Sequence, residues 1–199
     1  MKYWLAFCLT CLAVSARGEQ PTNVSPPLPK QVIEEYWNFE TSGGRVTVKG
    51  WNQSSRFFLQ PGPMPRERSI MVVGKDYSVW DPVIGGDTAE VIVGFQDICK
   101  CKINPSLQIV PSGSSRAIKT SVRFTLVLTS KHWEVDSHGD VRESEGHPQW
   151  RINVDTAESP VWLTVSTAIR YVRDMRNQSH DPATRKNADE TLAKLSRLP

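Results

Sequence analysis

The chain of 199 residues carries 24 lysines and arginines against 21 aspartates and glutamates, which gives a formal net charge of +3. With 39% hydrophobic residues it can build one ordinary core, and nothing in its length or composition indicates two large domains. Two of its four cysteines, Cys8 and Cys11, lie close to the N-terminus, so a small fold held together by several disulfides is excluded.

The N-terminus has the layout of a secretory signal peptide. Lys2 precedes an apolar run over residues 3–14, and small residues suited to cleavage follow at Ala16 and Gly18. The run is short for a bilayer span, although an uncleaved anchor is the alternative. We therefore expect an exported protein, periplasmic or secreted, with a leader over residues 1–18 and no transmembrane segment after cleavage.

A linker and two helices are predicted next. Residues 19–30 are rich in proline among polar residues, which is typical of a linker. Pro29 can open the first helix, which ends before two consecutive glycines. Thr47 can cap a second helix that stops before Pro61. The apolar faces of these helices predict core residues, which include Val32, Ile33, Tyr36, Trp37, Trp51 and Phe58.

From residue 69 the pattern changes to the two-residue period of strands. The segments 69–80, 88–103, 121–135 and 149–154 predict about four strands, all antiparallel. Bulges are predicted at Gly74, and near Ser130 and Lys131, where the apolar phase slips by one residue. The polar residues 136–147 predict the loop that joins the last two strands into a central hairpin.

The last forty residues predict an antiparallel pair of helices. Thr164 can cap the first, and Asp181 followed by Pro182 can cap and start the second. Both helices carry an apolar stripe that must dock on another part of the chain. The mild basic excess over residues 161–199 is more typical of a solvated helix face than of a nucleic-acid site, so no nucleic-acid partner is expected.

Two N-terminal helices followed by long, bent antiparallel strands that finish in Trp150, Arg151 and Ile152 form a recognisable pattern. It resembles the cone-shaped α+β superfamily named for nuclear transport factor 2 (NTF2), which includes SnoaL-like and ketosteroid-isomerase-like proteins. The resemblance covers residues 29–154. Two features depart from it: no third helix is evident within 61–69, and the C-terminal helices lie outside the common core.

The resemblance implies an α+β fold in which a curved antiparallel sheet packs on the N-terminal helices as an NTF2-like cone. This domain would span residues 31–160, with an added C-terminal helical hairpin over 161–199. Such a cone leaves a pocket between sheet and helices, apolar with a few polar groups. The superfamily includes isomerases and dehydratases as well as binding and dimerising modules, so the resemblance alone assigns no function.

Candidate ligand-binding residues for this pocket are Trp51, Tyr77, Trp80 and His132. An isomerase or dehydratase would need an internal base, for which Asp76 and His132 are the candidates. The competing interpretations are a core role for the aromatic residues, a surface position for Asp76 and a solvated His132. The other strand carboxylates, Glu90 and Asp97, are also more typical of a surface.

Cys99 and Cys101 lie two residues apart on a predicted strand. A disulfide between them would close a strained ring, so free thiols or an intermolecular bond are the simpler interpretations. No second cluster of cysteine and histidine has matching spacing, and we expect neither a metal nor another cofactor.

The preferred hypothesis is a non-catalytic, exported NTF2-like module that binds a small apolar ligand or a partner protein. Its support is the supply of aromatic and aliphatic residues without a convergent catalytic set. The alternative is a small isomerase, dehydratase or cyclase that acts on an apolar substrate in the cone pocket. A third hypothesis is an interaction protein that forms a homodimer through its sheet and contacts an acidic surface with its C-terminal helices.

Overall fold

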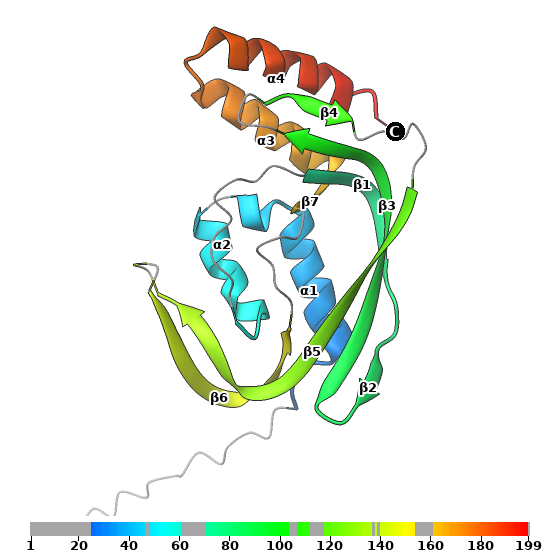
Figure 1. The fold of residues 1–199 in the computed structure, drawn as a ribbon, viewed down its shortest axis with the longest axis vertical. Coiled ribbons are helices and arrows are strands. Elements are labelled where there is room, and N and C mark those ends of the chain that lie inside the picture. Colours follow the sequence, from blue (N-terminus) through cyan, green and yellow to red (C-terminus); the bar gives the residue numbers. More distant parts are fainter. Residues whose placement is uncertain are drawn as a thin grey trace, which may run out of the picture.

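The structure is a computed structural model of the chain (Figure 1). It describes residues 25–46, 48–60, 71–103, 107–111, 118–136, 138, 140–153 and 161–198. The predicted leader and the first part of the predicted linker lie outside these residues, as does the predicted cap Thr47.

Among the described residues, two α-helices and two short 3-10 helices precede the sheet. They are α1 (Pro29–Thr41), η1 (Gly44–Val46), α2 (Val48–Ser54) and η2 (Ser55–Phe57). Pro29 opens α1 as predicted, since a proline costs no hydrogen bond in the first turn. The side-chain Oε1 of Gln31 reaches back and accepts from the Leu28 backbone N–H at 2.9 Å. The second predicted helix is shorter than expected, because the chain tightens to 3-10 geometry after Ser54.

Seven strands form one sheet within the described part of the chain. Its order is β6-β5-β3-β1-β7, with β2 and β4 each paired to β3. The four predicted strands are present and antiparallel, and they correspond to β1, β3, β5 and β6. The bounds are β1 (Met71–Val79), β2 (Val83–Gly85), β3 (Thr88–Ile103), β4 (Ile109–Pro111), β5 (Ile118–Val135), β6 (Val141–Ile152) and β7 (Val161–Thr164).

The strand register is irregular at both positions where a bulge was predicted. The pairing of β1 with β3 shifts on either side of Gly74. In the central hairpin, Thr129 pairs with Gln149 but Lys131 pairs with Glu145, so the extra residues lie in β6. Such irregularities bend a strand. β5 and β6 accordingly curve beneath α2 and η2 in Figure 1.

The main core fills the concave side of this curved sheet. The helix face predicted for α1 is buried there, and Trp37 is fully buried against Phe95, Phe124 and Trp162. Alternate residues of β3 and β5 complete the core, since successive strand side chains point to opposite faces. The N-terminal helices are therefore held inside the curl of the sheet (Figure 1).

A second core lies on the other face of β1, under the C-terminal helices α3 (Val165–Gln178) and α4 (Pro182–Leu195). Both predicted caps are confirmed: the Thr164 hydroxyl accepts from the Thr167 N–H, and the Asp181 carboxylate accepts from the first turn of α4. The α3–α4 pair docks as expected, and its buried side chains include Ala168, Val172, Ala188 and Leu195.

The strand β7 was not predicted and pairs parallel to β1. Its Trp162 faces the main core, whereas Val161 and Leu163 face the second core. A strand that is buried on both faces has a continuous apolar sequence. It therefore lacks the alternation of apolar and polar residues from which strands are predicted.

The loop predicted for residues 136–147 is also shorter than expected, because β6 begins at Val141. The segment 141–147 is polar on both faces, and its side chains are exposed or only half-buried. It forms a strand because its backbone pairs with β5, as Val135 with Val141 shows. The prediction of a loop for this segment, which was based only on its polar composition, was therefore wrong.

A fully buried ion pair joins α1, η1 and β7. The Arg45 guanidinium donates to both carboxylate oxygens of Glu40, at 2.6 Å from Nε and 2.5 Å from Nη2. The backbone N–H of Trp162 donates to Glu40 Oε1 at 3.1 Å. Burial opposes the charge on Arg45, but the adjacent Glu40 carboxylate outweighs it and raises the pKa of Arg45.

Candidate functional site

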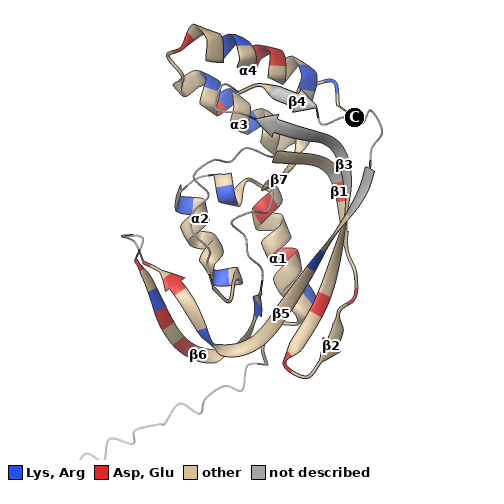
Figure 2. Cartoon of the chain, viewed as in Figure 1, with Lys and Arg blue, Asp and Glu red and all other residues tan. Residues whose placement is uncertain are grey.

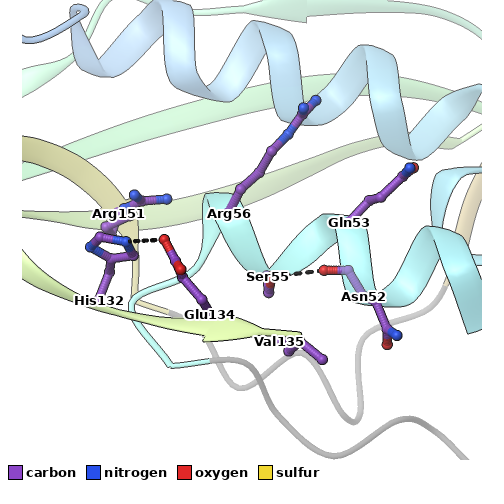
Figure 3. A pocket seen from close by; sticks show the side chains of 8 residues that line it. All are labelled: Asn52, Gln53, Ser55, Arg56, His132, Glu134, Val135 and Arg151. Atoms are coloured by element: carbon purple, nitrogen blue, oxygen red, sulfur yellow. Dashed lines mark hydrogen bonds and ion pairs between the residues drawn. The ribbon is translucent and has the colours of Figure 1, made fainter. Parts of the chain in front are cut away.

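A pocket of about 380 Å³ lies between α2–η2 and the curved end of the β5–β6 hairpin (Figure 3). Most of its lining side chains are polar or charged, and Val135 is the one aliphatic residue among them. The lining consists of Asn52, Gln53, Ser55, Arg56, His132, Glu134, Val135 and Arg151.

Backbone contacts fix the helical wall of the pocket against the hairpin. Just after η2, Phe58 forms a parallel bridge with Ile152 of β6. The Leu59 N–H then donates to the Ile152 carbonyl at 2.9 Å. Phe58 and Ile152 are both fully buried in the main core. The helical segment and the hairpin are therefore joined by hydrogen bonding and apolar packing next to the lining residues of η2 and β6.

His132 and Glu134 form the hairpin wall. They lie two residues apart on β5, so their side chains leave the strand on the same face. His132 Nε2 lies 2.9 Å from Glu134 Oε1, and the dashed line in Figure 3 marks this contact. The imidazole is mostly buried, while the carboxylate is 64% exposed. A carboxylate that holds Nε2–H leaves Nδ1 of the ring as an acceptor, which is the arrangement of an oriented general base.

Arg151 is a buried cation in the pocket wall. It lies between the core residues Trp150 and Ile152 on β6 and is only 7% exposed. Its Nη2 donates to Gln149 Oε1 at 2.9 Å, but its Nε is buried without a hydrogen-bond partner. Burial lowers the pKa of Arg151, and the negative charge of Glu134 partly offsets that effect.

Arg56 supplies the second cation of the lining. It extends from η2, and its guanidinium lies 4.6 Å from the ring centre of Phe57 and 5.9 Å from that of Phe39. Figure 3 shows this side chain pointing toward α1, away from Arg151. Its charge is therefore already in cation–π contact with the protein.

The charge of the pocket lining is positive. Two arginines against one glutamate leave +1 when His132 is neutral. Elsewhere the charges are mixed: Figure 2 shows basic and acidic residues interspersed along α3 and α4. There Arg176 pairs with Asp189 at 2.6 Å between Nε and Oδ1.

Of the four predicted ligand-binding residues, only His132 lines this pocket. Trp51 is buried in α2. Tyr77 lies on β1 with its ring against Trp37, and its hydroxyl donates to Asn38 Oδ1 at 2.5 Å. Trp80 is exposed, with its backbone N–H bound to the Ile92 carbonyl. The structure therefore does not bring these four side chains together.

The candidate base Asp76 is exposed on β1 and is not part of the pocket lining. Glu90 is paired with Arg123 at 3.2 Å on the sheet surface. The backbone of β3 places Cys99 opposite Val73, but the side chains of Cys99, Cys101 and Asp97 lie outside the described part of the structure.

Sequence reasoning missed the residues that give the pocket its charge. A histidine and a glutamate two residues apart on a strand share a face, so the spacing of His132 and Glu134 was a usable signal. Arg151 was read only as part of a family pattern, although a charged residue between two core residues is itself unusual. No local sequence pattern identifies Arg56 as a lining residue, because its place in the pocket depends on how η2 docks.

The described residues contain no group of three or more His, Cys, Asp or Glu side chains placed to share a metal ion. Among the described helices, none is both long enough and apolar enough to cross a membrane. No known family model, curated protein or solved structure matches the chain.

Proposed function

We propose that the chain is an exported, non-catalytic module of NTF2-like shape that binds a small molecule between α2–η2 and the β5–β6 hairpin. The observation that carries this proposal is the pocket itself, about 380 Å³ in volume, with side chains from two separate elements converging on it. The curl of the sheet around α1 and α2, with Trp150, Arg151 and Ile152 ending β6, supports the NTF2-like assignment.

The pocket lining favours a polar ligand over the apolar one expected from the sequence. Seven of its eight residues are polar or charged, and Val135 is the exception. An apolar ligand would exclude water from Arg151 and the other charged groups of the lining without supplying a hydrogen-bond partner, at a cost in free energy. A polar molecule can satisfy these groups, so we place it in the pocket.

Native mass spectrometry of the protein purified from its exported fraction tests this proposal. We expect a small-molecule mass that stays bound under native conditions and leaves on denaturation. A Val135→Trp variant places an indole in the pocket and should lose that mass, since Val135 lines it. Val83→Trp is the matched control, because Val83 is exposed on β2 and is not in the lining. If both variants retain the bound mass equally, the small molecule does not bind in this pocket and the proposal is refuted.

A small isomerase or dehydratase is the second candidate function. One observation favours it, namely that His132 is held by Glu134 inside the pocket and can act as a base. Turnover of the bound molecule should then be lost in His132→Gln and kept in Asp76→Asn, since Asp76 lies outside the pocket. A wild-type rate in His132→Gln would exclude the enzyme.

A further inference from the structure

We propose that the ligand of this pocket carries a carboxylate that pairs with the guanidinium of Arg151. This inference rests on the proposed binding function and names the chemical class of the ligand. It starts from Arg151, whose side chain lines the pocket and whose Nε is buried without a hydrogen-bond partner.

A buried arginine is costly unless a partner compensates for the loss of water. Gln149 accepts one hydrogen bond from Nη2, but its amide is neutral and supplies no counterion. No carboxylate among the described residues forms an ion pair with Arg151, whereas Arg45 is paired with Glu40 in the same fold. Of these two buried arginines, Arg151 is therefore the one that lacks a counterion, and its side chain lines the pocket.

Glu134, the acidic residue that influences the charge on Arg151, already has a partner in His132. Glu134 is close enough to influence the charge on Arg151, yet its Oε1 is bound to His132 Nε2 at 2.9 Å. Figure 3 shows His132 and Glu134 beside Arg151 at one end of the pocket. A ligand carboxylate could accept from the Arg151 guanidinium there without displacing Glu134 from His132. Guanidinium and carboxylate match in planar geometry, which favours this pairing.

The net charge of the pocket lining favours a ligand with a single negative charge. The lining carries two arginines and one glutamate, which is +1 with neutral His132, and Arg56 is already occupied by aromatic rings. One carboxylate would neutralise this charge. A phosphate dianion would bring a second negative charge near Glu134, which is unfavourable.

The test compares benzoate with benzamide, which has nearly the same shape but no charge, by NMR titration of the full chain. We expect benzoate to shift resonances of the pocket residues and to bind more tightly than benzamide. Arg151→Met should weaken benzoate binding at least about tenfold, as expected for loss of a hydrogen bond to a charged group. Arg123→Met removes the same charge from the sheet surface, outside the pocket lining, and should change the affinity by less than about threefold.

A stability measurement separates a ligand-binding Arg151 from a structural one. Because its charge is buried without a counterion, Arg151→Met should leave the urea midpoint unchanged or raise it. Equal binding of benzoate and benzamide, or a wild-type affinity for benzoate in Arg151→Met, would overturn the inference. Tighter binding of inorganic phosphate than of benzoate would overturn the assignment of a carboxylate.

The mass-spectrometry experiment distinguishes the two proposals. A copurified molecule that Val135→Trp loses and Arg151→Met retains in full would leave the binding pocket standing and refute the carboxylate. A molecule that both variants retain would refute the pocket itself.

Discussion

Breaking the buried pair of Glu40 and Arg45 should destabilise the fold strongly. Both side chains are almost completely buried, at 0% and 1% exposure, so neither charge can recover its lost contacts from water. Removing one partner of a buried pair costs about 3–5 kcal/mol. Arg45→Met would leave the carboxylate with only the Trp162 N–H among the contacts described above, and Glu40→Gln would leave the guanidinium without its counterion.

Urea unfolding followed by circular dichroism measures this cost. At a slope of about 2 kcal/mol per molar urea, a loss of about 4 kcal/mol lowers the midpoint by about 2 M. The double variant Glu40→Gln/Arg45→Met should recover much of the loss, because glutamine can still accept from the Trp162 N–H and no buried charge remains.

The exposed pair of Arg123 and Glu90 is the matched control. Its side chains are 65% and 42% exposed, and Nη1 and Oε1 are 3.2 Å apart. Arg123→Met should therefore cost no more than about 1 kcal/mol. The reasoning is refuted if Arg45→Met also costs less than about 1 kcal/mol, or if the double variant is no more stable than either single variant.

Two further predictions concern local features of the chain. Gly44→Ala would place a Cβ in steric conflict with the ring of Phe39 and should cost about 1–3 kcal/mol in urea unfolding. Gly85→Ala, whose Cβ would meet nothing closer than 4.0 Å, should cost much less, and equal costs would contradict the clash. Hydrogen bonds from the Thr184 side chain, then from the first-turn backbone, lower the pKa of Asp181. The resulting stabilisation is complete at neutral pH and is lost as the pH falls through that lowered pKa. Asp181→Asn should therefore be less stable than wild type at pH 7 and should approach it near pH 2; a difference that stays constant with pH would refute this assignment.

Local sequence was sufficient for the features that depend on neighbouring residues. The apolar face of α1, the caps at Thr164 and Asp181, and the bulge at Gly74 were all predicted and all confirmed. Each depends on side-chain period, on a side chain that reaches its own first turn, or on a break in alternation. These signals lie within a few residues of one another, so the sequence by itself contains them.

The tertiary structure decided what depends on contacts between distant segments. Strand β7 is recognisable only once β1 pairs with it and cores form on both of its faces. The segment 141–147 is a strand because β5 supplies its hydrogen bonds, although its composition is that of a loop.

The candidate site shows the same division. The sequence determined that His132 lies on a central strand and that Arg151 is flanked by core residues. Only the docking of η2 beside β6, where Phe58 is bridged to Ile152, placed Arg56 and Arg151 around one pocket. Burial and the absence of a counterion are properties of that packing, because they depend on which distant groups surround a charge.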